Sequence, residues 1–122
     1  MSKNILILED EPVLANIYKK NLEEAGFNVK CAVSVDEASK LLKDFKPDLS
    51  LLDHGIRGEE EAGLDFIPKL KKLFPNAKIV MLSNYSNQQI QKEADEAGVD
   101  DYLIKLNTPP KVLVEYVKKL FS

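Results

Sequence analysis

The chain has 122 residues, of which 44% are apolar and 30% charged, and its formal net charge at pH 7 is −3. This composition predicts one globular domain, excludes a disordered chain and offers no basic surface for nucleic acid or an anionic membrane. The only cysteine, Cys31, has no second cysteine for an internal disulfide, and the N-terminal run ILIL is too short for a signal sequence or a membrane span. We therefore expect a cytoplasmic protein.

Five short apolar runs are spaced along the chain. They cover 5–8, 28–33, 49–52, 78–83 and 102–105. The first, third and fourth runs are apolar on consecutive residues, which is typical of central strands that are covered on both faces. Each run is therefore predicted to be a strand.

An amphipathic stretch follows each strand, because apolar residues recur there at steps of three and four. The predicted helices include 13–22, 38–45, 64–74, 86–97 and 112–120. Gly26 is expected to end the first helix, and Ser34 with Glu37 forms a capping box at the start of the second. The second helix is expected to continue through Phe45 and to end before Pro47.

Five strand–helix units in succession predict an α/β fold, a parallel five-stranded sheet with helices on both faces, as in flavodoxin-like three-layer sandwiches. We expect strand order 2-1-3-4-5 in a single domain over 1–122, with no output domain in this chain. Ligands bind such sheets at the carboxyl edge, where the strand order reverses between the first and third strands.

Polar residues follow the strands at that edge. Glu9, Asp10 and Glu11 follow the first strand and Asp53 follows the third, while Ser83 and Lys105 end the fourth and fifth. Right-handed crossovers bring all carboxyl ends to one edge, so Asp10 and Asp53 are expected to face each other with Lys105 nearby.

Carboxylates so close together repel one another unless their pKa values rise or a cation joins them. Mg²⁺ suits one or two carboxylates with water and a phosphate oxygen. An aspartate can also attack phosphorus, and phosphoryl transfer needs mainly positioning and nearby positive charge. The residues therefore suggest an acid that accepts a phosphoryl group with Mg²⁺.

The segments ILILEDEP, the apolar strand ending in Asp53, MLSN and AGVDDYLIK are similar to the receiver domain of two-component response regulators, over essentially the whole chain. The resemblance implies that Asp53 is the phosphoacceptor. It implies Mg²⁺ ligation by Asp10, by Asp53, by Glu9 through water and by the Gly55 carbonyl. It further implies that Lys105 pairs with the phosphoryl oxygens and that Ser83 and Tyr102 are switch residues.

The same resemblance implies that the phosphoryl donor is a phosphohistidine on a sensor histidine kinase or a histidine phosphotransfer protein. The helix at 86–97 has few apolar residues to bury, and thinly held helices move at low cost. We therefore expect a downstream protein to bind the 86–121 face in a state-dependent way.

Three positions depart from the family pattern. Arg57 replaces the usual proline, Gly63 comes two residues late, and Leu106 replaces the proline that follows the lysine. A cis bond before a residue other than proline costs about 3–4 kcal/mol. The 105–106 bond is therefore expected to be trans with Lys105 displaced, or cis and strained.

Other interpretations follow from the same residues. The acids at 9–11 before Pro12 could simply start a helix. Because the loop after Asp53 departs from the family pattern at Arg57 and Gly63, the chain could also be a receiver-like protein-interaction module that has lost or altered phosphorylation. A flavodoxin-like cofactor binder is disfavoured because no Ser/Thr/Gly-rich loop follows the first strand. A haloacid-dehalogenase-like phosphatase is also disfavoured. It needs two aspartates two residues apart after the first strand, and the sequence Glu-Asp-Glu at 9–11 does not provide that pair.

Overall fold

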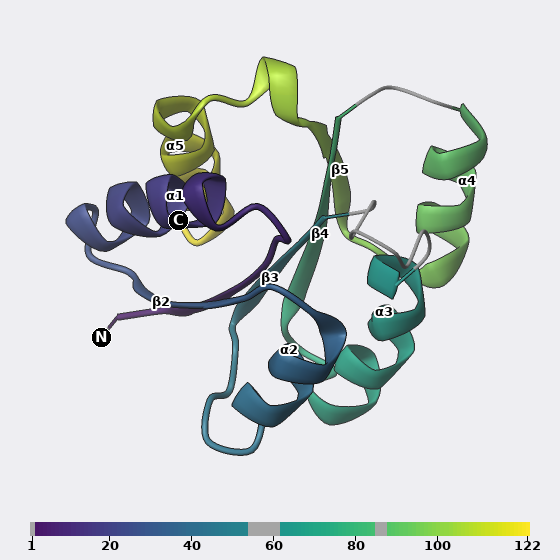
Figure 1. The fold of residues 1–122 in the computed structure, drawn as a ribbon. Helices are drawn as coiled ribbons and strands as arrows, with labels where there is room; N and C mark the ends of the chain where they lie inside the picture. The colour runs from purple at the N-terminus through teal and green to yellow at the C-terminus, as the bar shows by residue number, and fades with distance from the viewer. Residues whose placement is uncertain (1, 54–61, 85–87) are drawn as a thin grey trace.

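The computed structural model describes residues 2–53, 62–84 and 88–122. Its strands are β1 Asn4–Leu8, β2 Asn28–Ala32, β3 Leu49–Asp53, β4 Lys78–Ser83 and β5 Asp101–Ile104. Its helices are α1 Pro12–Glu24, α2 Val35–Leu41, α3 Ala62–Leu73, α4 Gln88–Ala97 and α5 Pro110–Leu120, with a 3₁₀ turn, η1, at Lys105–Asn107. All strand pairs are parallel, and the order β2-β1-β3-β4-β5 confirms the predicted fold (Figure 1).

Two apolar cores hold the sheet between its helical layers. Helices α1 and α5 cover one face, and α2, α3 and α4 cover the other (Figure 1). Successive residues of a strand point to opposite faces, so Ile7 belongs to the α1/α5 core while Leu6 belongs to the other. Residues 5–8 of β1 and all of β3 are buried, as expected for strands covered on both sides.

Local signals set most helix boundaries. Gly26 adopts a φ of +100° just after α1, a conformation that glycine adopts without a Cβ clash. The Glu37 amide donates to Ser34 Oγ over 3.1 Å, so the predicted cap of α2 is confirmed. The α-helix ends earlier than predicted, at Leu41. Phe45 is buried instead by a turn in which its amide donates to the Leu41 carbonyl.

The register of the central strands places the functional candidates at one edge. Leu8 pairs with Leu52, so Glu9 and Asp53 are the next residues on adjacent strands. Ser83, the last residue of β4, pairs with Ile104, and Lys105 follows it. Within the described ranges, the helices are too short or too polar to cross a membrane.

Candidate functional site

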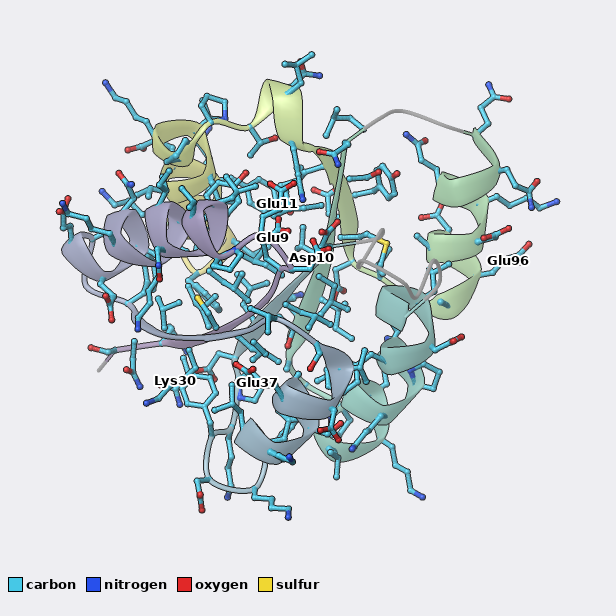
Figure 2. The ribbon with its side chains drawn as sticks, viewed as in Figure 1. Glu9, Asp10, Glu11, Lys30, Glu37 and Glu96 are labelled. Atoms are coloured by element: carbon cyan, nitrogen blue, oxygen red, sulfur yellow. The ribbon has the colours of Figure 1, made fainter. Side chains whose placement is uncertain are left out.

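Three carboxylates converge at the carboxyl edge of β1 and β3. One carboxylate oxygen from each of Glu9, Asp10 and Asp53 lies within 4.8 Å of the others. Glu9 is 2% exposed and Asp53 4%, while Asp10 is partly exposed. Figure 2 shows Glu9 and Asp10 beside the start of α1 and the ends of the central strands. The cluster is therefore a largely buried acidic site with access to solvent through Asp10.

The start of α1 accounts for only part of the arrangement of these acids. Glu11 occupies the N-cap position, yet its side chain makes no capping bond, and Pro12 forms the first turn. The amide of Glu11 donates to Glu9 Oε2 over 3.3 Å. Glu9 is therefore held by the backbone that enters the helix, while its other oxygen faces the site.

Lys105 brings the positive charge into this cluster. Its Nζ lies 2.5 Å from Glu9 Oε1 and 3.2 Å from Asp53 Oδ2, and its side chain is only 8% exposed. The 105–106 peptide bond is trans, one of the two predicted alternatives, but the accompanying displacement of Lys105 was wrong. A 3₁₀ turn over Lys105–Asn107 absorbs the change in chain direction, and Leu106 points outward with 87% exposure.

Thr108, which we did not predict from the sequence, fastens that turn. Its amide donates to the Lys105 carbonyl over 3.0 Å, and its hydroxyl donates to the Ile104 carbonyl over 2.8 Å. Thr108 is 4% exposed. The only signal in the sequence was a hydroxyl residue three positions after the lysine and just before two prolines, where a turn is expected.

Tyr18 of α1 is a second residue whose place near the site was not predicted. It appeared in the sequence as an ordinary apolar-face position, and it is 2% exposed. Burial raises the pKa of its phenol, while the charge of Lys105 lowers this pKa and the charge of Glu9 raises it. Tyr18 therefore lies close enough to the acidic site for the charges there to influence its pKa.

Burial of like charges shifts the protonation of the site. Burial raises the pKa of the Glu9 carboxyl from 4.5 to about 7, a hydrogen bond with Asp53 adds to this rise, and Lys105 partly offsets it. Burial disfavours the charged form of Lys105, but its bonds to Glu9 and Asp53 outweigh this effect and raise its pKa. Lys105 therefore stays charged at neutral pH, while Glu9 is poised to gain or lose a proton.

The remaining candidates lie as follows. Ser83 is 2% exposed at the end of β4, next to the strand that carries Asp53. Tyr102 of β5 is half-buried against the α2/α3/α4 core, and its amide donates to Asp101 Oδ1. Gly55 lies outside the described residues, as does Arg57.

The donor set fits a hard divalent cation. All three clustered groups offer carboxylate oxygens, which Mg²⁺ and Ca²⁺ prefer, and the described cluster contains no thiolate or imidazole. A cation would also stabilise the charged form of Glu9, which burial and the neighbouring Asp53 disfavour. The residues therefore suit a divalent-metal site that is largely buried and partly exposed at Asp10.

Sequence comparison identifies the family. The pattern of the response regulator receiver domain matches residues 5–118. The chain belongs to the response regulator receiver domain family. Chemotaxis protein CheY of Thermotoga maritima is 34% identical over 121 residues, which are 98% of each chain. The alginate biosynthesis transcriptional regulatory protein AlgB of Pseudomonas aeruginosa is 30% identical over 95% of this chain, which spans only 25% of AlgB.

Solved structures agree with this assignment. A response regulator from Thermotoga maritima has a TM-score of 0.83 at 30% identity, over 98% of this chain and 97% of that one. A response regulator from Burkholderia pseudomallei has a TM-score of 0.80 at 33% identity, over 85% of this chain and 60% of that one. The Burkholderia crystal contains a phosphorylated aspartic acid, a calcium ion and citrate. The present receiver domain is thus a phosphorylation-switched signalling domain of the two-component type.

Proposed function

We propose that Asp53 is the phosphoacceptor of this receiver domain. The observation that carries the proposal is the buried triangle of Glu9, Asp53 and Lys105, in which an ammonium group lies 3.2 Å from the Asp53 carboxylate. A carboxylate held beside a cation at the carboxyl edge of a parallel sheet is placed for attack on a bound phosphoryl group.

In the proposed step, an Asp53 oxygen forms a bond to phosphorus while the bond from phosphorus to the donor imidazole nitrogen breaks. The bonding electrons leave with the imidazole, which takes up a proton if it was not already protonated. Lys105 contributes positive charge next to the developing acyl phosphate, and Ser83 contributes a hydroxyl from the neighbouring strand. The donor is a histidine kinase or a histidine phosphotransfer protein.

Glu9, Asp10 and Asp53, with the Gly55 carbonyl, would hold Mg²⁺ as the physiological cation. The bound cation supplies charge neutralisation for the phosphoryl oxygens. Ca²⁺ has the same preference for oxygen and takes more ligands at longer distances, so the two ions are compared directly in the assay below.

The assay is incubation with acetyl phosphate and Mg²⁺, followed by intact-mass measurement. The proposal expects a gain of one phosphoryl group in the wild type and none in Asp53→Asn. Asp44→Asn is the matched control, because Asp44 is an exposed aspartate in a turn of the same chain. Phosphorylation that needs Mg²⁺ and proceeds more slowly with Ca²⁺ supports Mg²⁺. A wild type that gains no mass would favour the alternative, a receiver-like interaction module without phosphorylation.

The proposed output surface is the α4–β5–α5 face, within 86–121. Tyr102 lies on β5 between the two helices, and α4 is a mainly polar helix in which Ala94 is fully buried. If the Ser83 hydroxyl donates a hydrogen bond to the phosphoryl group, the segment that leads from Ser83 into α4 would shift toward the site. Hydrogen exchange of α4, β5 and α5 should change when beryllofluoride and Mg²⁺ are added, and unchanged rates would contradict this surface.

A further inference from the structure

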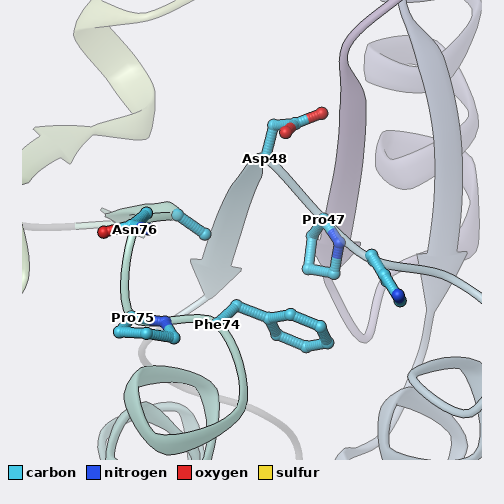
Figure 3. A pocket seen from close by; sticks show the side chains of 7 residues that line it. Pro47, Asp48, Phe74, Pro75 and Asn76 are labelled. Carbon is cyan, nitrogen blue, oxygen red and sulfur yellow. The ribbon is translucent and has the colours of Figure 1, made fainter.

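A second recess lies at the opposite edge of the sheet from the acidic site. Residues 46–48, which precede β3, and residues 74–77, which precede β4, enclose a cavity of about 250 Å³ that opens on the surface (Figure 3). We call it the amino-edge groove. It shares no lining residue with the acidic cluster, so the receiver function does not account for it.

Hydrogen bonds anchor both walls of this groove. Asn4 holds the first wall, because its amide donates to Asp48 Oδ2 over 2.8 Å and its side chain donates to the Lys46 carbonyl over 3.0 Å. The Lys78 amide donates to the Asp48 carbonyl over 2.9 Å and links the two walls. The Ala77 amide donates to the Phe74 carbonyl and closes the second wall as a turn. The groove is therefore preformed, which lowers the entropic cost of binding.

The lining of the groove is about half polar and half apolar, and its apolar part includes one aromatic ring. Pro47 stands on one wall, and Phe74 and Pro75 stand on the other, with the Phe74 ring directed toward the Pro47 side (Figure 3). The Asp48 carboxylate points away from that ring and accepts the Asn4 amide. A cavity of this size takes an apolar side chain or two rather than a whole cofactor, since cofactor and drug sites measure about 300–1,000 Å³.

The two chain segments that form the groove are rich in lysine, although the protein as a whole is acidic. Residues 40–48 and 66–78 contain seven lysines and two aspartates, although the whole chain carries a net charge of −3. Lys46 lines the groove, and Lys78 follows its second wall; both side chains are exposed. The exposed Lys46 and Lys78 thus favour an anionic partner at the groove, although Asp48 also lines it.

We propose that the amino-edge groove binds a short acidic peptide segment of a partner protein, with one apolar side chain inserted against Phe74 and Pro47. The apolar part of the lining favours an apolar side chain of the peptide, and the lysines favour acidic residues on either side of that side chain. Nucleic acid fits less well, because the remainder of the chain is strongly acidic and repels a long polyanion. The site lies away from the phosphoacceptor, so a partner bound there leaves Asp53 accessible to its donor.

The test uses the ¹⁵N-labelled 122-residue chain and a capped peptide of six residues, with a Leu-Phe pair flanked on each side by two acidic residues. The proposal expects saturable amide shift changes confined to residues 43–48 and 72–78. A peptide with the acids replaced by lysine should bind at least about tenfold more weakly. Raising the salt from about 0.05 M to about 0.3 M should weaken binding of the acidic peptide by several-fold.

Lys46→Glu combined with Lys78→Glu should reduce the affinity for the acidic peptide by at least about tenfold, and Lys20→Glu on α1 should not. All three lysines are exposed, so these variants are expected to fold. No shift changes at millimolar peptide, or changes centred elsewhere, would overturn the proposal. So would equal binding of the lysine peptide or tighter binding of a single-stranded oligonucleotide. The assay involves no phosphoryl group, so its failure leaves the role of Asp53 untouched.

Discussion

Lys105 Nζ and Glu9 Oε1 lie 2.5 Å apart, although the two residues are separated by 96 positions in the chain. The pair joins the end of β1 to the turn after β5, and it reaches across β4 and across β3, which carries Asp53. Lys105 therefore has two partners in a buried site. Its removal affects the folding of the domain as well as its chemistry.

We expect Lys105→Ala to lower the free energy of unfolding by about 3 kcal/mol at pH 8, because it leaves two buried carboxylates without their cation. Lys118→Ala is the matched control, since the Lys118 side chain is 53% exposed and its Nζ lies 3.9 Å from Glu115 Oε1. An exposed pair of this kind contributes at most about 1 kcal/mol. Urea unfolding of both variants measures the difference. Equal losses would show that the Lys105 contacts do not stabilise the fold.

The raised pKa of Glu9 predicts a pH-dependent stability. The folded protein binds the Glu9 proton more tightly than the unfolded chain, whose value is near 4.5. This contribution is complete below pH 4.5 and is lost as the pH rises through about 7, with a total on the order of 3 kcal/mol. Glu9→Gln resembles the protonated form at every pH. The stability of Glu9→Gln relative to the wild type should therefore grow between pH 5 and pH 8 in urea titrations without divalent cation.

Glu37→Gln serves as the control for this titration, because Glu37 is exposed on α2 and does not belong to the acidic cluster. Its stability relative to the wild type should change little over the same range. A constant difference between Glu9→Gln and the wild type from pH 5 to pH 8 would contradict the raised pKa.

Thr108→Val tests the turn that carries Lys105. Valine keeps the shape of threonine but loses the hydroxyl that donates to the Ile104 carbonyl, so we expect a loss of about 1 kcal/mol in stability. We also expect slower phosphorylation by acetyl phosphate, because Lys105 would be held less firmly. Thr108→Ser should restore both. A Val variant that is destabilised yet phosphorylated at the wild-type rate would assign Thr108 to folding alone.

Substitution of Ser50 and of Ser34 by alanine is predicted to change the stability of the fold in opposite directions. Ser50, the second residue of β3, is 1% exposed, and its hydroxyl has no hydrogen-bond partner among the described residues. Removing an unpaired buried hydroxyl should raise stability by about 1 kcal/mol. Removing the Ser34 hydroxyl, which caps α2, should lower it by about 1 kcal/mol. Thermal unfolding of the two variants distinguishes the effects, and a destabilised Ser50→Ala would reveal an unrecognised role for that hydroxyl.

Much of the architecture was predictable because it depends on short-range patterns. Consecutive apolar residues mark buried strands such as 49–53, and spacing by three and four marks the helices between them. Parallel strands bring their carboxyl ends to one edge, so the meeting of Asp10 and Asp53 followed from the topology. The cap at Ser34 was equally local. These features need no knowledge of distant packing.

The path of the chain around Lys105 was decided by tertiary structure. From the sequence, Leu106 in place of proline implied that Lys105 would be displaced or its bond strained. In the folded protein, a 3₁₀ turn and the two bonds of Thr108 carry a trans peptide while the ammonium stays in the site. The division of that ammonium between Glu9 and Asp53, and the raised pKa of Glu9, depend on distances of a few ångströms and on burial. A linear pattern identifies which charged residues approach one another, but desolvation and packing determine which of them pair.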